Sequence, residues 1–301
     1  MRRVLVAGLA LAGLLVTGCG GGQAPQGDAA ASPTSPGRSA TSSAAPDTAT
    51  SSASSSATSA APETTATPRP SATTRRPTTT TRPPATAGVP ARLAGVDWER
   101  IPTTSKVVAL TFDAGGDAAG LPSILATLRS SGVRATFFLT GRWARQHPDQ
   151  LAAIKAGGHR LGNHTDTHPH LPPLSDAQVT EQVRRAEQAI RAAGADPRPF
   201  FRFPFGDRTA HDIALVNRLG YVSVRWTVDT LGWKGTSGGQ SAASVTARVL
   251  AAARPGEIVL MHVGSNPDDH TTLDASALPR VISGLRAKGY RFVTLAAFGA
   301  G

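Results

Sequence analysis

The sequence predicts an α/β domain with a largely parallel sheet, covering residues 96–301. Two observations support this fold class. Short apolar runs alternate with helical patterns throughout this part of the chain, as they do in parallel sheets covered by helices. Polar motifs also follow several of the apolar runs, and the loops after parallel strands share one face of a barrel. We therefore expect a single domain with its site at one mouth.

The predicted strands are the apolar runs at residues 107–112, 135–139, 200–203, 221–226, 258–261 and 291–295. The predicted helices cover residues 121–128, 148–156, 175–194, 211–219, 243–253 and 278–288. Three local signals support the helix ends. Pro122 lies near a first turn, Gly157 and Gly158 follow a last turn, and Ser175 and Gln178 are spaced as a capping box.

The N-terminus has the pattern of an export signal. Met1-Arg2-Arg3 precedes an apolar run at residues 4–16, which is too short for a stable membrane span, and then Thr17-Gly18-Cys19. The ending resembles a bacterial lipobox, which implies a signal peptide at residues 1–18 and a lipid on Cys19. The alternative is an ordinary signal peptide with an incidental cysteine. Because Cys19 is the only cysteine, no disulfide can form within the chain.

Residues 19–95 are rich in Ser, Thr, Ala and Pro and are expected to form a disordered tether, because they cannot bury enough apolar surface to offset their chain entropy. About 70 flexible residues span roughly 50 Å. A lipid-anchored domain on the outer face of a bacterial membrane could thus reach into the cell wall. A plain spacer is the alternative.

The chain carries a net charge of +11. Arg2 and Arg3 contribute +2 and the tether +3, which leaves +6 for the folded part. Export argues against a nucleic-acid partner. We expect attraction to anionic lipids or acidic wall polymers, with a solvated arginine-rich surface as the alternative. A monomer is expected.

The most informative stretch is residues 162–170, Gly-Asn-His-Thr-Asp-Thr-His-Pro-His. His164 and His168 are four residues apart, so both imidazoles can point the same way and bind one metal ion. A divalent metal is predicted, with zinc as the first choice. The alternative is a pair of surface histidines in a loop.

Four more motifs follow apolar runs in the order Thr111-Phe112-Asp113, Arg202-Phe203-Pro204-Phe205-Gly206, Asp229-Thr230-Leu231-Gly232-Trp233 and Leu260-Met261-His262. Together with the histidine pair, they resemble the polysaccharide deacetylases of carbohydrate esterase family 4, the NodB homology domain. The resemblance runs from about Lys106 to Phe298. It implies a distorted (β/α) barrel and a divalent metal that serves to remove acetyl groups from amino sugars or sugar esters.

The resemblance implies that Asp113 is the general base and that His164 and His168 are metal ligands. The family's metal-binding aspartate is replaced by Ala114. We expect Asp117 to fold back across two glycines and complete the metal shell. Asp113 or a more remote group could do so instead, and Asp117 could simply cap a helix beginning near residue 118.

On the other side of the expected site, the resemblance implies that His262 is the general acid. Gly232 stands where the family has an aspartate that tunes this histidine, so either Asp229 takes over the tuning or His262 is untuned. A structural role for His262 is the alternative.

The remaining implied roles concern the base and the substrate pocket. Arg202 should orient Asp113, with an ordinary ion pair as the alternative. The backbone N–H of Phe205 should hold the oxyanion. Trp233 should form a wall of the acetyl pocket, unless it belongs to the core, and Leu260 should line the pocket.

We therefore expect a deacetylase acting on N-acetylated wall polysaccharide, with peptidoglycan as the first choice of substrate. An esterase acting on O-acetyl groups of xylan-like polymers is the nearest enzymatic alternative. A non-catalytic glycan-binding homologue is the third, because Ala114 and Gly232 depart from the family pattern.

Overall fold

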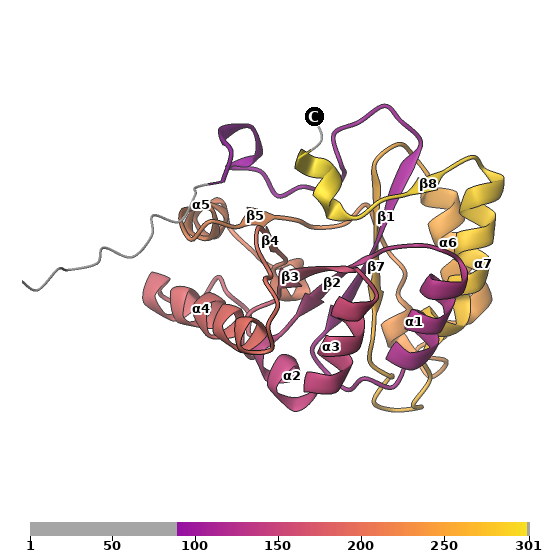
Figure 1. Cartoon of the computed structure of the whole chain (residues 1–301), viewed down its shortest axis with the longest axis horizontal. Coiled ribbons are helices and arrows are strands. Elements are labelled where there is room, and N and C mark those ends of the chain that lie inside the picture. Colours follow the sequence, from indigo (N-terminus) through magenta and orange to yellow (C-terminus); the bar gives the residue numbers. More distant parts are fainter. Residues whose placement is uncertain (1–88, 300–301) are drawn as a thin grey trace, which may run out of the picture. The chain divides into compact units, whose positions relative to one another are not determined.

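The computed structural model describes residues 89–299 (Figure 1). The predicted signal peptide, Cys19 and the tether up to residue 88 lie outside the described residues. Residues 89–95 pack against the domain, since Leu93 is buried in a short 3-10 helix, η1 (Ala91–Leu93), and its carbonyl accepts a hydrogen bond from Trp98 Nε1. No helix in residues 89–299 is long and apolar enough to cross a membrane.

The sheet has eight strands, and every ladder between them is parallel, as the sequence predicts. The strands are β1 (Val107–Ala114), β2 (Thr136–Leu139), β3 (Arg160–Asn163), β4 (Phe200–Phe201), β5 (Val222–Ser223), β6 (Val228–Asp229), β7 (Glu257–His262) and β8 (Arg291–Phe292). Their order is β5-β4-β3-β2-β1-β7-β6, with β8 beside the start of β1. The sheet is curled, and its end strands β5 and β6 do not pair. It is therefore an open, distorted half-barrel rather than a closed barrel.

The helices are α1 (Leu121–Ser130), α2 (Gly141–Gln146), α3 (Pro148–Ala156), α4 (Asp176–Ala192), α5 (Ala210–Arg218), α6 (Ala242–Ala252) and α7 (Leu273–Ala287). Three more 3-10 helices are η2 (Pro204–Gly206), η3 (Gly232–Lys234) and η4 (Leu295–Gly299). The predicted capping box at Ser175 and Gln178 is present at the start of α4.

Two differences from the expected elements matter for the site. The run predicted as one strand at residues 221–226 holds only the short strand β5, and a second short strand, β6, follows it at the opposite edge of the sheet. Helix α7 begins at Leu273 rather than at residue 278, so that Pro279 lies inside it. The earlier start is stabilised by burial of Leu273 and Ala277 against the core.

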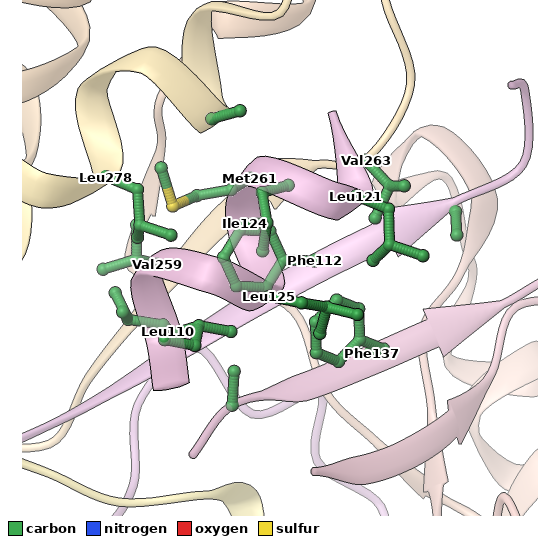
Figure 2. Packing of buried hydrophobic residues seen from close by; sticks show 14 of the residues in the cluster. Leu110, Phe112, Leu121, Ile124, Leu125, Phe137, Val259, Met261, Val263 and Leu278 are labelled. Carbon is green, nitrogen blue, oxygen red and sulfur yellow. The ribbon is translucent and has the colours of Figure 1, made fainter. Parts of the chain in front are cut away.

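The largest core cluster lies between the sheet and helices α1 and α7 (Figure 2). Leu110 and Phe112 of β1 point into this cluster, as does Ala114. Because neighbouring strand residues point to opposite faces, Asp113 is directed away from these helices. The alternation therefore explains both the apolar residue at position 114 and the placement of Asp113 on the inner face of the curled sheet.

Candidate active site

The carboxyl ends of the central strands surround one cavity of about 730 Å³. Asp113 of β1 and His262 of β7 are direct register partners, so the parallel pairing itself brings them together. Most of the residues selected from the sequence line this cavity, namely Asp113, His164, His168, Phe205, Asp229, Trp233, Leu260 and His262. Arg202 and Asp117 do not line it.

Asp113 and Arg202 form a buried ion pair. Arg202 Nη1 donates to Asp113 Oδ1 at 2.7 Å, and its Nε and Nη2 donate to the carbonyls of Val224 and Arg225. The guanidinium is fully buried and lies 4.1 Å from the ring centroid of Phe138. Burial alone would raise the pKa of Asp113, but the charges around it, Arg202 first, outweigh burial and lower the pKa. Asp113 is therefore held ionised in a fixed orientation.

The two histidines are placed by a tight loop after β3, not by a helix. Asn163 Oδ1 accepts the N–H of Thr165, and Thr165 Oγ1 accepts the N–H of His168. Thr165 and His168 both have positive φ angles, of 67° and 64°. This turn brings the two imidazole centroids to 4.7 Å from each other. The two histidines, four residues apart, therefore lie side by side as predicted, and a loop turn rather than a helix brings them together.

The hydrogen bonds of His164 determine which of its nitrogens is free. A carbonyl only accepts, so the 2.8 Å contact with the carbonyl of Arg202 assigns the proton to Nδ1 of His164. Nε2 then carries a lone pair. Burial is the first cause that lowers the pKa of both histidines, and it brings the pKa of His168 to about 3. Both rings are thus neutral, the form that binds metals.

The donor chemistry at this place fits a divalent cation. The lone pair on His164 Nε2 faces Asp113 Oδ2 at 3.4 Å, and two electron-rich atoms at that distance attract a cation between them. Nitrogen and carboxylate oxygen donors suit zinc and similar metals. Within residues 89–299, no three side chains are already set in ligating geometry.

Asp117 lies in a different environment from the one expected of a ligand. Its Oδ1 accepts the N–H groups of Ala119 and Ser265 at 2.8 and 3.0 Å, and its Oδ2 accepts the hydroxyl of Ser265 at 2.7 Å. These bonds outweigh the effect of burial and lower the pKa of Asp117. Asp117 does not cap α1 either, because that helix begins at Leu121 and its N-cap, Gly120, has no side-chain cap hydrogen bond. Asp117 also fixes the loop after β7, and Ser265 in that loop lines the cavity.

His262 faces a carboxylate that the sequence analysis missed. Asp274, in the first turn of α7, accepts the backbone N–H of His262 at 2.8 Å, and its Oδ2 lies 3.6 Å from His262 Nδ1. Burial alone would lower the pKa of His262, but Asp274, together with Asp113 and Asp229, raises it. No motif pointed to Asp274, because it belongs to a helix turn that the sequence pattern did not place.

Comparison with known proteins agrees with this geometry. The polysaccharide deacetylase profile matches residues 100–224. The chain is 37% identical over 195 residues to a peptidoglycan-N-acetylglucosamine deacetylase of Bacillus cereus, which covers 64% of this chain and 68% of the relative. The chain belongs to the polysaccharide deacetylase family. Its identity to PgdA, the peptidoglycan-N-acetylglucosamine deacetylase of Listeria monocytogenes, is 35%, over 64% of this chain but only 38% of that relative.

Solved structures of polysaccharide deacetylases share the fold. The Bc1960 peptidoglycan N-acetylglucosamine deacetylase superposes with a TM-score of 0.61 at 34% identity, over 66% of this chain and 91% of the other. BA3943 of Bacillus anthracis, described as a pseudoenzyme of the same family, gives a TM-score of 0.60 at 29% identity, over 66% and 67%. The predicted distorted (β/α) barrel is confirmed.

In this member of the polysaccharide deacetylase family, the cavity is flanked by exposed aromatic side chains. Phe205 is 58% exposed and stacks on the ring of His170 at 4.1 Å, and Trp233 is 47% exposed. Trp233 is therefore not a core residue. Asp229 Oδ1 accepts the N–H of Leu231, and its Oδ2 lies 3.4 Å from Trp233 Nε1, so Asp229 orders the turn that carries the tryptophan. The role of the Phe205 N–H stays a prediction.

Proposed function

We propose that this protein is a hydrolase that removes acetyl groups from N-acetylated cell-wall polysaccharide, with peptidoglycan N-acetylglucosamine as its substrate. The observation that carries the proposal is the pairing of Asp113 and His262 across β1 and β7 at the mouth of one cavity. An ionised carboxylate and a histidine with a raised pKa form a base and an acid next to two neutral imidazoles. The names of the relatives support the substrate class.

In the proposed reaction, Asp113 takes a proton from the water that attacks the acetyl carbon. The oxygen of that water forms the new bond to carbon, and the bond from carbon to the sugar nitrogen breaks. His262 gives its proton to the departing amine, so that acetate and a free amino sugar leave. Arg202 engages Asp113 Oδ1, which leaves Oδ2 as the oxygen that can take the proton.

His164 and His168 would hold the metal, zinc by first choice, and the negative charge of Asp113 lies beside them, with Oδ2 at 3.4 Å from His164 Nε2. The metal would act as a Lewis acid toward the acetyl carbonyl and activate water. Phe205 and Trp233 offer apolar surfaces for the sugar, and Leu260 lines the same cavity.

The proposal includes the location of the protein. Export, a lipid on Cys19 and the tether between that cysteine and the packed residues from 89 onward would hold the domain at the outer face of the membrane, within reach of the wall. Replacing Cys19 by serine should release the protein from the membrane fraction. A monomer is sufficient for the proposed reaction, since all the implied groups come from one chain.

Acetate release tests the proposed reaction. The full-length protein, freed of metal by a chelator, is given zinc and then peptidoglycan, N-acetylglucosamine oligomers or acetylated xylan. We expect zinc-dependent acetate release from the first two and little from xylan. Release from xylan alone would establish the esterase alternative. Binding to peptidoglycan without acetate release, under zinc or other divalent metals, would establish the non-catalytic one.

A further inference from the structure

Gly232 leaves a space that a carboxylate from another element occupies. A Cβ atom at position 232 would overlap Asp274 Oδ1 and would lie 2.6 Å from Asp274 Cγ. Real Cβ atoms essentially never approach so closely. The backbone of Gly232 does not itself require glycine, because its φ angle lies outside the left-handed region. The neighbouring carboxylate is therefore the reason that a side chain is excluded at this position.

Asp274 is held in this space by a complete set of hydrogen bonds. Its side chain is buried, Thr230 Oγ1 donates to Oδ1 at 2.7 Å, and the N–H of His262 donates to Oδ2 at 2.8 Å. Thr230 is fully buried as well and also accepts the N–H of Gly232. The carboxylate thus ties the turn after β6 to the end of β7, and its position is set by both.

The same carboxylate faces the ring of His262. Nδ1 of His262 is buried, lies 3.6 Å from Asp274 Oδ2, and has no hydrogen-bond partner among the described residues. A small rotation of the imidazole would bring Nδ1–H within hydrogen-bond distance. Catalytic hydrogen bonds are often this long before substrate binds. With Nδ1 turned toward Asp274, Nε2 is the nitrogen that remains for the cavity.

Asp229 does not supply this contact. The backbone N–H of Leu231 and the indole Nε1 of Trp233 engage its two oxygens, which directs the carboxylate to its own turn. The charge of Asp229 contributes to the raised pKa of His262, but the carboxylate that faces Nδ1 of the ring belongs to Asp274.

We propose that Asp274 is the positioning residue for the general acid His262, and that Gly232 exists to leave room for it. The carboxylate orients the imidazole by accepting Nδ1–H, so that Nε2 presents its proton to the departing amine. This carboxylate comes from the first turn of α7, whereas the family resemblance places one at position 232, before Trp233. The inference rests on the proposed deacetylase function.

The first test replaces Asp274 by alanine in the full-length protein loaded with zinc. We expect kcat to fall on the order of 10²-fold, because the acid loses its orientation, while KM changes by less than about threefold. The matched control is Asp212→Ala, which removes another buried aspartate from the first turn of a helix, the N-terminal capping box of α5. The control should lose thermal stability but keep its kcat.

The second test removes the carboxylate of Asp274 and places a new one at position 232. In the double variant Gly232→Asp/Asp274→Ala, removal of the old carboxylate clears the space for the new one, and we expect kcat to recover by about tenfold or more over Asp274→Ala. The matched double variant Gly232→Ala/Asp274→Ala fills the same space without a charge and should not recover. A general loss of stability would not be corrected by a carboxylate at position 232.

A spectroscopic measurement separates this inference from the proposed function. Nitrogen-15 spectra of the imidazoles at alkaline pH, where the rings are neutral, should show His262 protonated on Nδ1 in the unmodified protein and a mixture of tautomers in Asp274→Ala. An unmodified protein without deacetylase activity overturns the proposed function. An active protein in which Asp274→Ala keeps its kcat, or in which the alanine double variant recovers equally, overturns the role of Asp274.

Discussion

The two sides of the cavity hold histidines in opposite states. On one side, burial is the first cause that lowers the pKa of His164 and His168, and both rings are neutral. On the other side, Asp274 is the first group to oppose burial at His262, and the pKa there is raised. Nδ1 of His164 lies 2.8 Å from an uncharged carbonyl, whereas Nδ1 of His262 faces a carboxylate at 3.6 Å. One residue type therefore serves as lone-pair donor or as proton donor according to its partner.

The largest expected effect on turnover comes from the side of the cavity that holds His164 and His168. His164→Ala removes a donor nitrogen next to Asp113 Oδ2, so we expect loss of bound zinc and a fall in kcat on the order of 10³-fold or more, since the metal contributes several kcal/mol to the reaction. Zinc content by elemental analysis and acetate release measure the two effects. His211→Ala is the control, because that histidine is exposed and pairs with Asp176 away from the cavity. If His164→Ala kept both its zinc and its turnover, His164 would not be a metal ligand, and the proposed difference between the two sides of the cavity would be wrong.

A comparison of Asp113 with Asp117 tests which carboxylate contributes to zinc binding beside the two histidines. Asp113→Asn should lower kcat by about 10³-fold, because the base is lost, and should weaken zinc binding, because the variant removes the negative charge beside His164. Asp117→Asn should keep its zinc, and its kcat should stay within a few-fold, because an amide oxygen can still accept from Ala119 and Ser265. Zinc titration of each variant decides between them. Zinc lost from the Asp117 variant and kept in the Asp113 variant would restore the ligand role expected from the sequence.

Much of this arrangement can be read from local sequence signals. The apolar run of β1 and the Ser175 capping box depend on near neighbours, and both occur as predicted. The motifs with Asp113 and His262 converge because each follows a parallel strand, and adjacent parallel strands bring their ends together. The period-2 alternation of a strand also explains why position 114 is apolar, since Ala114 points into the core.

The parts that could not be predicted depend on packing between distant elements. Asp274 reaches His262 only because α7 starts at Leu273, earlier than the predicted residue 278, and packs against η3. The reason for Gly232 is a contact with a residue 42 positions later, which no local pattern contains. Asp117 has two glycines before it that would allow it to fold back, but its oxygens bind the loop after β7, 148 residues away.

The smallest effect tests whether burial shifts the pKa of a carboxyl group, as burial is the first cause that lowers the pKa of His168. Glu257, at the opposite end of β7 from His262, is fully buried, and neither of its carboxylate oxygens has a hydrogen-bond partner in residues 89–299. Burial raises the pKa of Glu257 to about 7, and the backbone and charge of Arg254 offset this only in part. The carboxyl group is therefore the acidic counterpart of His168, since burial favours the neutral form of each.

The sign of the effect on stability follows from proton binding. In the unfolded chain the carboxyl loses its proton near its ordinary pKa, whereas in the folded protein it keeps the proton up to about pH 7. The folded state binds more protons between these values, so the free energy of unfolding falls as pH rises through this range and is lowest above it.

Glu257→Gln removes this dependence of stability on pH. We expect the variant to be more stable than the unmodified protein by about 3 kcal/mol at pH ~8 and by under about 1 kcal/mol at pH ~5. Urea unfolding of the full-length chain at both pH values measures the difference, with Glu181→Gln as the control, because that glutamate is exposed. Equal effects at the two pH values would mean that Glu257 finds a partner on folding, and that burial alone does not decide its charge.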